Sequence, residues 1–151
     1  MPSITNDSEL RNLIDSLSFE QQRALGVRFA GAVAGFSQDS RLARAFQTAA
    51  AKDATPEDLD EAMKVAKTIA INTYTACGKD TDWMAQAEHF VAAALWAALA
   101  PAEQHAGKST PAWKAAMQAR MARNCAMIES GEGGLDNEAA RQYQVAAELA
   151  P

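Results

Sequence analysis

Four polar residues interrupt two otherwise apolar stretches of this chain: Asn72, Tyr74, Glu88 and His89. A buried carboxylate is costly unless another group pairs with it. We therefore expect Glu88 to contact one of the other three residues, or Arg23 or Arg28. Two interpretations remain open. The cluster is either a polar layer that fixes the register of two packed helices, or a ligand pocket in which Glu88 and His89 orient a small molecule.

Other residue types that perform chemistry form no recognisable motif. The two histidines, His89 and His105, include no Glu-x-x-His pair of the kind that binds metal in helical bundles. Cys77 and Cys125 belong to no Cys-x-x-Cys spacing, and we expect both to be buried thiols. Gly-x-Ser-x-Gly and Gly-rich phosphate loops are absent from the sequence. We therefore assign no catalytic residue, metal or cofactor.

Acidic residues are concentrated at one point of a chain whose net charge is −5: Asp53, Glu57, Asp58, Asp60 and Glu61. Nucleic-acid binding requires a basic face, so this distribution argues against a nucleic-acid partner. It favours a basic protein partner, because complementary fields steer association. The alternative is that these acids only complement the N-terminus of a helix.

The helices that position these residues are indicated by their end signals. A threonine N-cap, a proline and two acids at 55–58 predict a helix start, and this helix should reach about Cys77 with Gly78 as its stop. The next helix should begin near Thr81 or Asp82 and end before Pro101. The short connection predicts an antiparallel hairpin in which paired positions sum to about 160. This register places Asn72 level with Glu88.

The segment 90–100 is apolar on every side of a helix. Such a helix must be surrounded by other helices. We therefore predict an all-α, single-domain bundle of six or seven helices, spanning 1–151, around a central apolar helix at about 82–100. The run is shorter than the roughly 20 residues that span a bilayer. Together with a start that lacks signal-peptide features, it predicts a cytoplasmic protein without membrane contact.

Further helix starts are predicted at Asp7 or Ser8, at the Ser18–Gln21 capping box, near 39, at Thr110-Pro111 and at Asp136. Three glycines in the second helix, Gly26, Gly31 and Gly35, suggest that another helix passes very close. A stripe at intervals of four, Trp113, Met117, Met121 and Cys125, is expected to pack in the core. Arg120 and Arg123 are expected to pair with the acidic segment or with Glu129.

The segment 20–30, Glu-Gln-Gln-Arg-Ala-Leu-Gly-Val-Arg-Phe-Ala, precedes Ala- and Trp-rich helices at 83–100 and 112–126 and an amphipathic end at 138–149. In this spacing of Arg and Ala with scattered Trp, the chain resembles the helical immunity proteins of bacterial polymorphic toxin systems. The resemblance covers most of residues 18–149. It implies a non-enzymatic inhibitor that binds a cognate toxin, and it supplies no catalytic residue. The glycines of the second helix and the long helix after 55 have no counterpart in the family pattern.

The function we predict is that of a non-enzymatic interaction protein, with the acidic segment 53–61 as its contact region. Two other classes stay open. One is a small-molecule-binding or catalytic bundle centred on the polar cluster of Asn72, Tyr74, Glu88 and His89. The other is a structural subunit of a larger complex, in which the apolar helix supplies a contact between copies. A polar cavity beside Glu88 would favour the first of these two.

Overall fold

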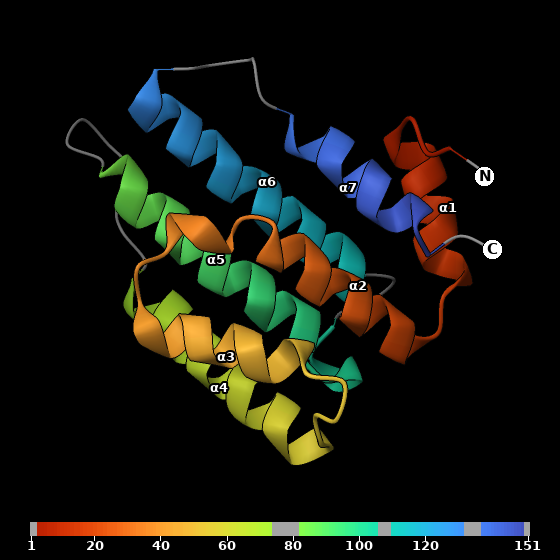
Figure 1. Ribbon diagram of the computed structural model, residues 1–151, viewed down its shortest axis with the longest axis horizontal. Helices are drawn as coiled ribbons and strands as arrows, with labels where there is room; N and C mark the ends of the chain where they lie inside the picture. Colours follow the sequence, from red (N-terminus) through yellow and green to blue (C-terminus); the bar gives the residue numbers. More distant parts are fainter. Residues whose placement is uncertain (1–2, 74–81, 106–109, 132–136, 150–151) are drawn as a thin grey trace.

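The computed structural model describes residues 3–73, 82–105, 110–131 and 137–149. Within these ranges the chain forms seven α-helices, two 3-10 turns and no strand, as the sequence predicts. In chain order the elements are α1 (Asp7–Ser16), α2 (Phe19–Gly31), η1 (Ala34–Phe36), α3 (Ser40–Ala50), α4 (Pro56–Asn72), α5 (Trp83–Leu99), η2 (Ala102–Gln104), α6 (Pro111–Ser130) and α7 (Glu138–Ala147), as Figure 1 shows.

Local capping chemistry explains where most helices begin. The expected capping box forms at Ser18 for α2, and the predicted N-cap Thr55 forms a second one with Asp58 for α4. Asp82 caps α5 by accepting a hydrogen bond from the backbone N–H of Ala85. α7 differs from expectation, because its N-cap is Asn137 and not Asp136. Asp136 lies outside the described residues.

The C-terminus of α4 comes five residues earlier than predicted. The helix ends at Asn72, and Thr73 leaves helical geometry as the C-cap. The Thr73 hydroxyl donates a hydrogen bond to the carbonyl oxygen of Ile69 at 2.6 Å, so the side chain binds a backbone group of the last turn. Cys77 and Gly78, the predicted end and stop, lie outside the described residues.

α5 occupies the centre of the bundle, as its apolar sequence predicts. It packs against α6, α4 and α2, and it runs between α6 and α4 in Figure 1. Val91 and Leu95 are fully buried. A Cβ added to Gly26 of α2 would lie 2.9 Å from the Cβ of Ala98, so this glycine permits the expected close approach. Gly31 and Gly35 have no such neighbour within 4 Å, and the expectation for them is wrong.

A second apolar cluster joins the two ends of the chain. It contains residues of α1, α2, α6 and α7: Leu10, Ile14, Leu25, Phe29, Ala112, Ala116 and Ala146. Beside it the Arg120 guanidinium pairs with the Asp7 carboxylate, and the Tyr143 hydroxyl donates to the same carboxylate at 2.8 Å. The first and last helices, α1 and α7, accordingly lie side by side in Figure 1.

The pairing expected for the α6 arginines is wrong. Arg120 binds Asp7 of α1, and Arg123 binds the buried carboxylate of Glu138 in α7. The expected core stripe is also corrected, because Met121 is 44% exposed and only Cys125 of the four is buried. The face of α6 that packs inward consists of alanines instead: Ala112, Ala115, Ala116, Ala119 and Ala122. Alanine lets the neighbouring helices approach closely, which leaves the bulkier methionines outside.

Candidate functional site

The register predicted for the α4–α5 hairpin is confirmed at His89. Its Nδ1 donates a hydrogen bond to the carbonyl oxygen of Ala70 at 2.8 Å and lies 3.3 Å from the Thr73 hydroxyl. The residue numbers in each of these pairs add up to about 160, as expected for two antiparallel helices joined by a short loop. His89 therefore ties the last turn of α4 to α5.

The rotation of the two helices differs from what the polar cluster requires. Asn72 is exposed, and among the described residues it makes no hydrogen bond to Glu88. The Glu88 carboxylate accepts a hydrogen bond from the backbone N–H of Gln38 at 3.1 Å, just before α3. Tyr74 lies outside the described residues. Residues at the same height on two packed helices touch only when both lie on the faces that pack together. On α4 that face carries Ala70, which contacts His89, whereas Asn72 is exposed.

The arginines expected beside Glu88 are also elsewhere. Arg28 pairs with Glu148 at the surface. Arg23 extends toward the end of α5, where its Nη2 donates to the carbonyl oxygen of Leu99 at 2.6 Å. Burial lowers the pKa of the Arg23 guanidinium, and its buried Nε has no hydrogen-bond partner in the described part of the chain. This arginine compensates a helix C-terminus, where carbonyl groups carry partial negative charge.

Arg23 lies against a pocket of about 340 Å³ between the start of α2, the end of α3 and the start of α4. We call it the acid-rimmed pocket. Its walls are mainly apolar and small, and Glu20 stands at its edge. The residues that line it are Glu20, Arg23, Ala24, Val27, Ala49, Ala51, Ala54, Pro56, Leu59 and Leu99.

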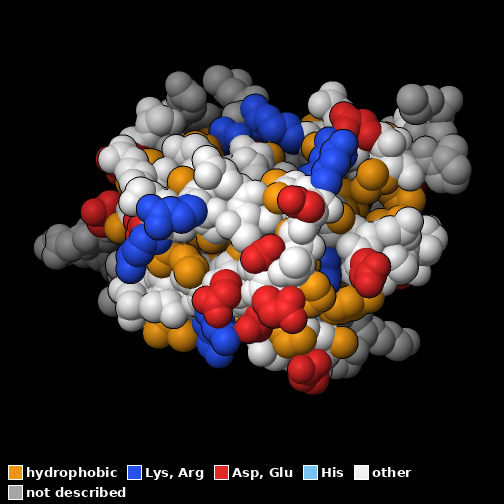
Figure 2. Space-filling view, turned by 60° about the horizontal axis from the view of Figure 1, so that its bottom comes forward, with side chains coloured by type: hydrophobic (Ala, Val, Ile, Leu, Met, Phe, Trp, Pro, Cys, Tyr) orange, Lys and Arg blue, Asp and Glu red, His pale blue; other side chains and the backbone are white. Residues whose placement is uncertain are grey.

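All five predicted acids are exposed, but none of them lines this pocket. Asp58 and Glu61 line a separate hollow between α3 and α4, together with Arg41 and Arg44. Two have structural partners: Asp58 accepts from the backbone N–H of Thr55, and Asp60 pairs with Lys64. Asp53, Glu57 and Glu61 make no ion pair within the residues that the structure describes. The acidic side chains gather on one face in Figure 2. Folding therefore uses only part of this charge.

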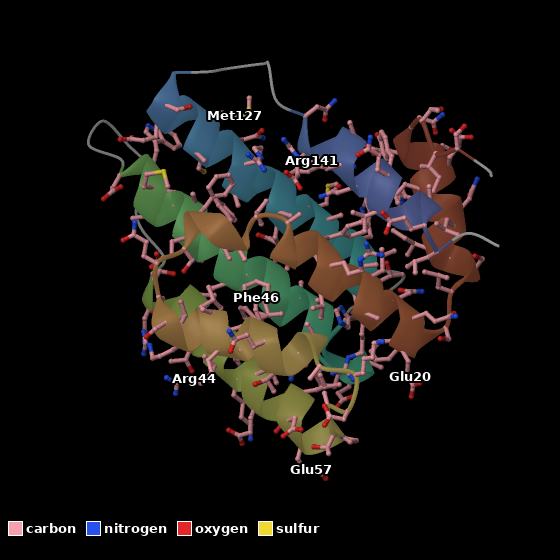
Figure 3. The ribbon with its side chains drawn as sticks, viewed as in Figure 1. Glu20, Arg44, Phe46, Glu57, Met127 and Arg141 are labelled. Atoms are coloured by element: carbon pink, nitrogen blue, oxygen red, sulfur yellow. The ribbon has the colours of Figure 1, made fainter. Side chains whose placement is uncertain are left out.

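Glu20 and Glu57 come from different helices but flank the same end of the bundle. Figure 3 shows both side chains pointing outward, and Arg44 of α3 also projects from the surface. Glu20 lines the pocket directly, and Glu57 follows the lining residue Pro56. Only long-range packing brings Glu20 to the pocket that Ala54 and Pro56 also line, so no local sequence pattern could have indicated this residue.

A second concave surface lies on the other side of α5, between α4 and α6. It consists of two adjoining hollows, of about 590 and 370 Å³, which share Ala93, Trp96 and Gln118. We call it the α5 groove. His89 of the predicted polar cluster lines its wider part, beside Ile71 and Phe90. His89 is the residue of that cluster that lines this groove.

Among the described residues, no group of three or more His, Cys, Asp or Glu residues is arranged to hold a metal ion. None of the described helices is long and apolar enough to cross a membrane. Comparisons of the chain with protein-family models, curated proteins and solved structures found no match.

Proposed function

We propose that this protein is a non-enzymatic inhibitor of the immunity type, which binds a basic protein partner at the acid-rimmed pocket. The observation that carries the proposal is the combination of an apolar pocket with exposed acids that folding leaves unpaired. Glu20 lines the pocket from α2, and the exposed Asp53 and Glu57 are chain neighbours of the lining residues Ala54 and Pro56. This combination matches the anatomy of a protein-binding surface better than that of a reactive centre.

The pocket and its rim have separate tasks in this proposal. Binding energy at protein interfaces is concentrated in a few anchors that fill desolvated pockets, and the charged rim contributes mainly to association rate and selectivity. A pocket of about 340 Å³ with alanine, valine, leucine and proline walls accepts an apolar side chain. Lysine or arginine residues beside that anchor would face Glu20 and Glu57.

The described contacts do not bring Asn72 and Glu88 of the rival small-molecule site together. Its central carboxylate, Glu88, is occupied by the backbone of Gln38, and Asn72 faces solvent. An oligomer contact through α5 has little surface available on the sides that face α2 and α6, because Ala94, Leu95 and Ala98 are fully buried there. We therefore develop the protein-binding function alone.

A rescue experiment tests the inhibitor. The product of the reading frame adjacent to this gene should arrest growth when it is expressed alone, and co-expression of this protein should restore growth. The variant Glu20→Lys/Glu57→Lys should lose the rescue. Asp15→Lys/Glu129→Lys is the matched control, because it changes the net charge equally at two exposed positions of α1 and α6. The control should rescue fully.

A binding measurement separates the surface from the biological setting. The probe is a pair of amphipathic helical peptides with the same apolar face, one flanked by lysines and the other by glutamates. The basic peptide should bind more tightly in fluorescence anisotropy, and its affinity should fall as salt rises. Glu20→Lys/Glu57→Lys should weaken it at least tenfold. Equal loss in the Asp15→Lys/Glu129→Lys control would contradict a defined site.

A further inference from the structure

We propose that the α5 groove is a second docking site, which accepts an amphipathic helix with acidic flanks from a protein partner. This site is independent of the proposed function, because it lies on another face of α5 and carries the opposite charge. Its floor is formed by the half-buried Ala93 and Ala97 of α5 and by the buried C-cap residue Ala100. Its walls come from α4 and α6.

The small side chains of the floor allow another helix to approach closely. Ala93, Ala97 and Ala100 are spaced by four and three residues, so they follow one face of α5. On another face of the same helix, α2 already packs in this manner, with Gly26 against Ala98. The segment from His89 to Ala100 is about 16 Å long in helical geometry. That length corresponds to about three turns of a docked helix.

The walls leave apolar side chains partly in water. Ile71 of α4 is 58% exposed at one side of the groove. Trp96 lines both hollows, and Met117 of α6 lies on the opposite wall, one turn before the exposed Met121. Methionine adapts its shape to different partners, and helix-in-groove recognition uses apolar residues at this spacing. The groove is long and open, so it is suited to a helix more than to an enclosed small molecule.

The charge of the groove selects the flanks of the partner helix. Lys114 lines one hollow, and the ammonium of Lys67 lies 5.7 Å from the centroid of the Trp96 ring. Neither lysine makes an ion pair in the part of the chain that the structure describes. Among the described residues that line the two hollows there is no aspartate or glutamate, and Glu88 is engaged with Gln38. The charged groups that the described structure places at the groove lining and over its Trp96 ring are therefore the two lysines, on a protein of net charge −5.

His105 contributes shape and no additional charge near neutral pH. Its Nε2 donates to the carbonyl oxygen of Ala100 at 3.1 Å, which holds the ring at the end of the groove. Burial is the largest cause that lowers the pKa of this imidazole. The attraction for acidic flanks consequently comes from Lys67 and Lys114.

The experiment uses the acidic and basic amphipathic peptides described above with the full-length protein. The acidic peptide should bind, and Lys67→Glu/Lys114→Glu should raise its Kd at least tenfold. The matched control Lys52→Glu/Arg44→Glu changes the same net charge at exposed positions around α3 and should change the Kd less than threefold. Ala97→Glu, which fills the floor, should also abolish binding, with circular dichroism as the check on folding.

The two surfaces are distinguished by reciprocal variants. Glu20→Lys/Glu57→Lys should not weaken the acidic peptide, and Lys67→Glu/Lys114→Glu should not weaken the basic peptide. No binding of the acidic peptide, or equal loss in the lysine variant and its control, would overturn the groove proposal and leave the acid-rimmed pocket untouched. Two other occupants would also overturn the groove proposal. One is a fatty acid, shown if laurate monomers bind and the acidic peptide does not. The other is a second copy of this chain, shown by sedimentation.

Discussion

The absence of a side chain at Gly26 determines how closely α2 approaches the central helices. A Cβ placed there would meet the Cβ of Ala98 at 2.9 Å and that of Ala115 at 3.3 Å. These neighbours belong to α5 and α6, so one position controls a three-helix contact. Gly31, in the last turn of the same helix, faces open space. A substitution at Gly26 therefore tests helix packing, whereas the same substitution at Gly31 tests the backbone entropy of the helix.

We expect Gly26→Ala to destabilise the protein and Gly31→Ala to leave its stability unchanged or raised. Overpacking in a filled core costs about 1–3 kcal/mol, which exceeds the gain of up to about 1 kcal/mol in helix propensity. At Gly31 only the propensity gain of up to about 1 kcal/mol remains. Urea unfolding monitored by circular dichroism measures both free energies. Equal shifts for the two variants would show that the contact at Ala98 relaxes without cost.

The polar cluster shows which residue-scale features were predictable. The register of the hairpin was correct, because His89 meets Ala70 near the expected level. The rotation of the two helices about their own axes was not predicted correctly. Glu88 accepts a hydrogen bond from the backbone of Gln38, and Asn72 is exposed to solvent. Loop length constrains which positions are level with each other. Which face turns inward depends on α2, α3 and α6, whose contacts are distant in sequence.

At the scale of elements, the N-caps of the helices were the most predictable features. Ser18 and Thr55 begin their helices as local chemistry requires, and Gly131 ends α6 with a positive φ of 77°. The end of α4 was less predictable, because the bond from Thr73 to Ile69 competes with continuation of the helix. The acid-rimmed pocket was not predictable at all. It requires α2, α3 and α4 to enclose one hollow, and no local pattern encodes that arrangement.

The central position of α5 predicts a large effect of truncation. Leu95 is fully buried among the helices around α5, so Leu95→Ala should lower the free energy of unfolding by about 2–5 kcal/mol. Met121→Ala on α6 provides the comparison, because that side chain is 44% exposed and should cost less than about 1 kcal/mol. Chemical denaturation of the two variants checks the difference. A cost below about 1 kcal/mol for Leu95→Ala would contradict a central α5.

At the scale of the whole molecule, one carboxylate connects the two ends of the chain. Asp7 of α1 accepts two hydrogen bonds from Arg120 of α6 and one from Tyr143 of α7. The hydrogen bonds from Arg120 are the main reason that the pKa of Asp7 lies below its ordinary value. The fold therefore favours the ionised carboxylate, and its stability depends on pH through this group.

We expect Asp7→Asn to cost about 1 kcal/mol at pH 7, less than a fully buried charged hydrogen bond because the carboxylate is 46% exposed. The contribution of Asp7 is complete above the ordinary pKa of about 4 and is lost as the pH falls through the lowered value in the folded protein. The gap in unfolding free energy between wild type and Asp7→Asn should narrow over that acidic range. A gap that stays constant from pH 7 to pH 2 would show that the carboxylate is not the cause.

The alanines between α5 and its neighbours also determine how the bundle responds when a bound helix displaces α5. An alanine side chain has no rotamers, so ordering this interface loses no side-chain entropy. For the same reason the interface has no alternative side-chain arrangements with which to absorb a displacement. A helix that presses on Ala93 and Ala97 from the groove would move α5 as a rigid rod against Gly26. The core would transmit that movement to α2 as a translation of the whole helix.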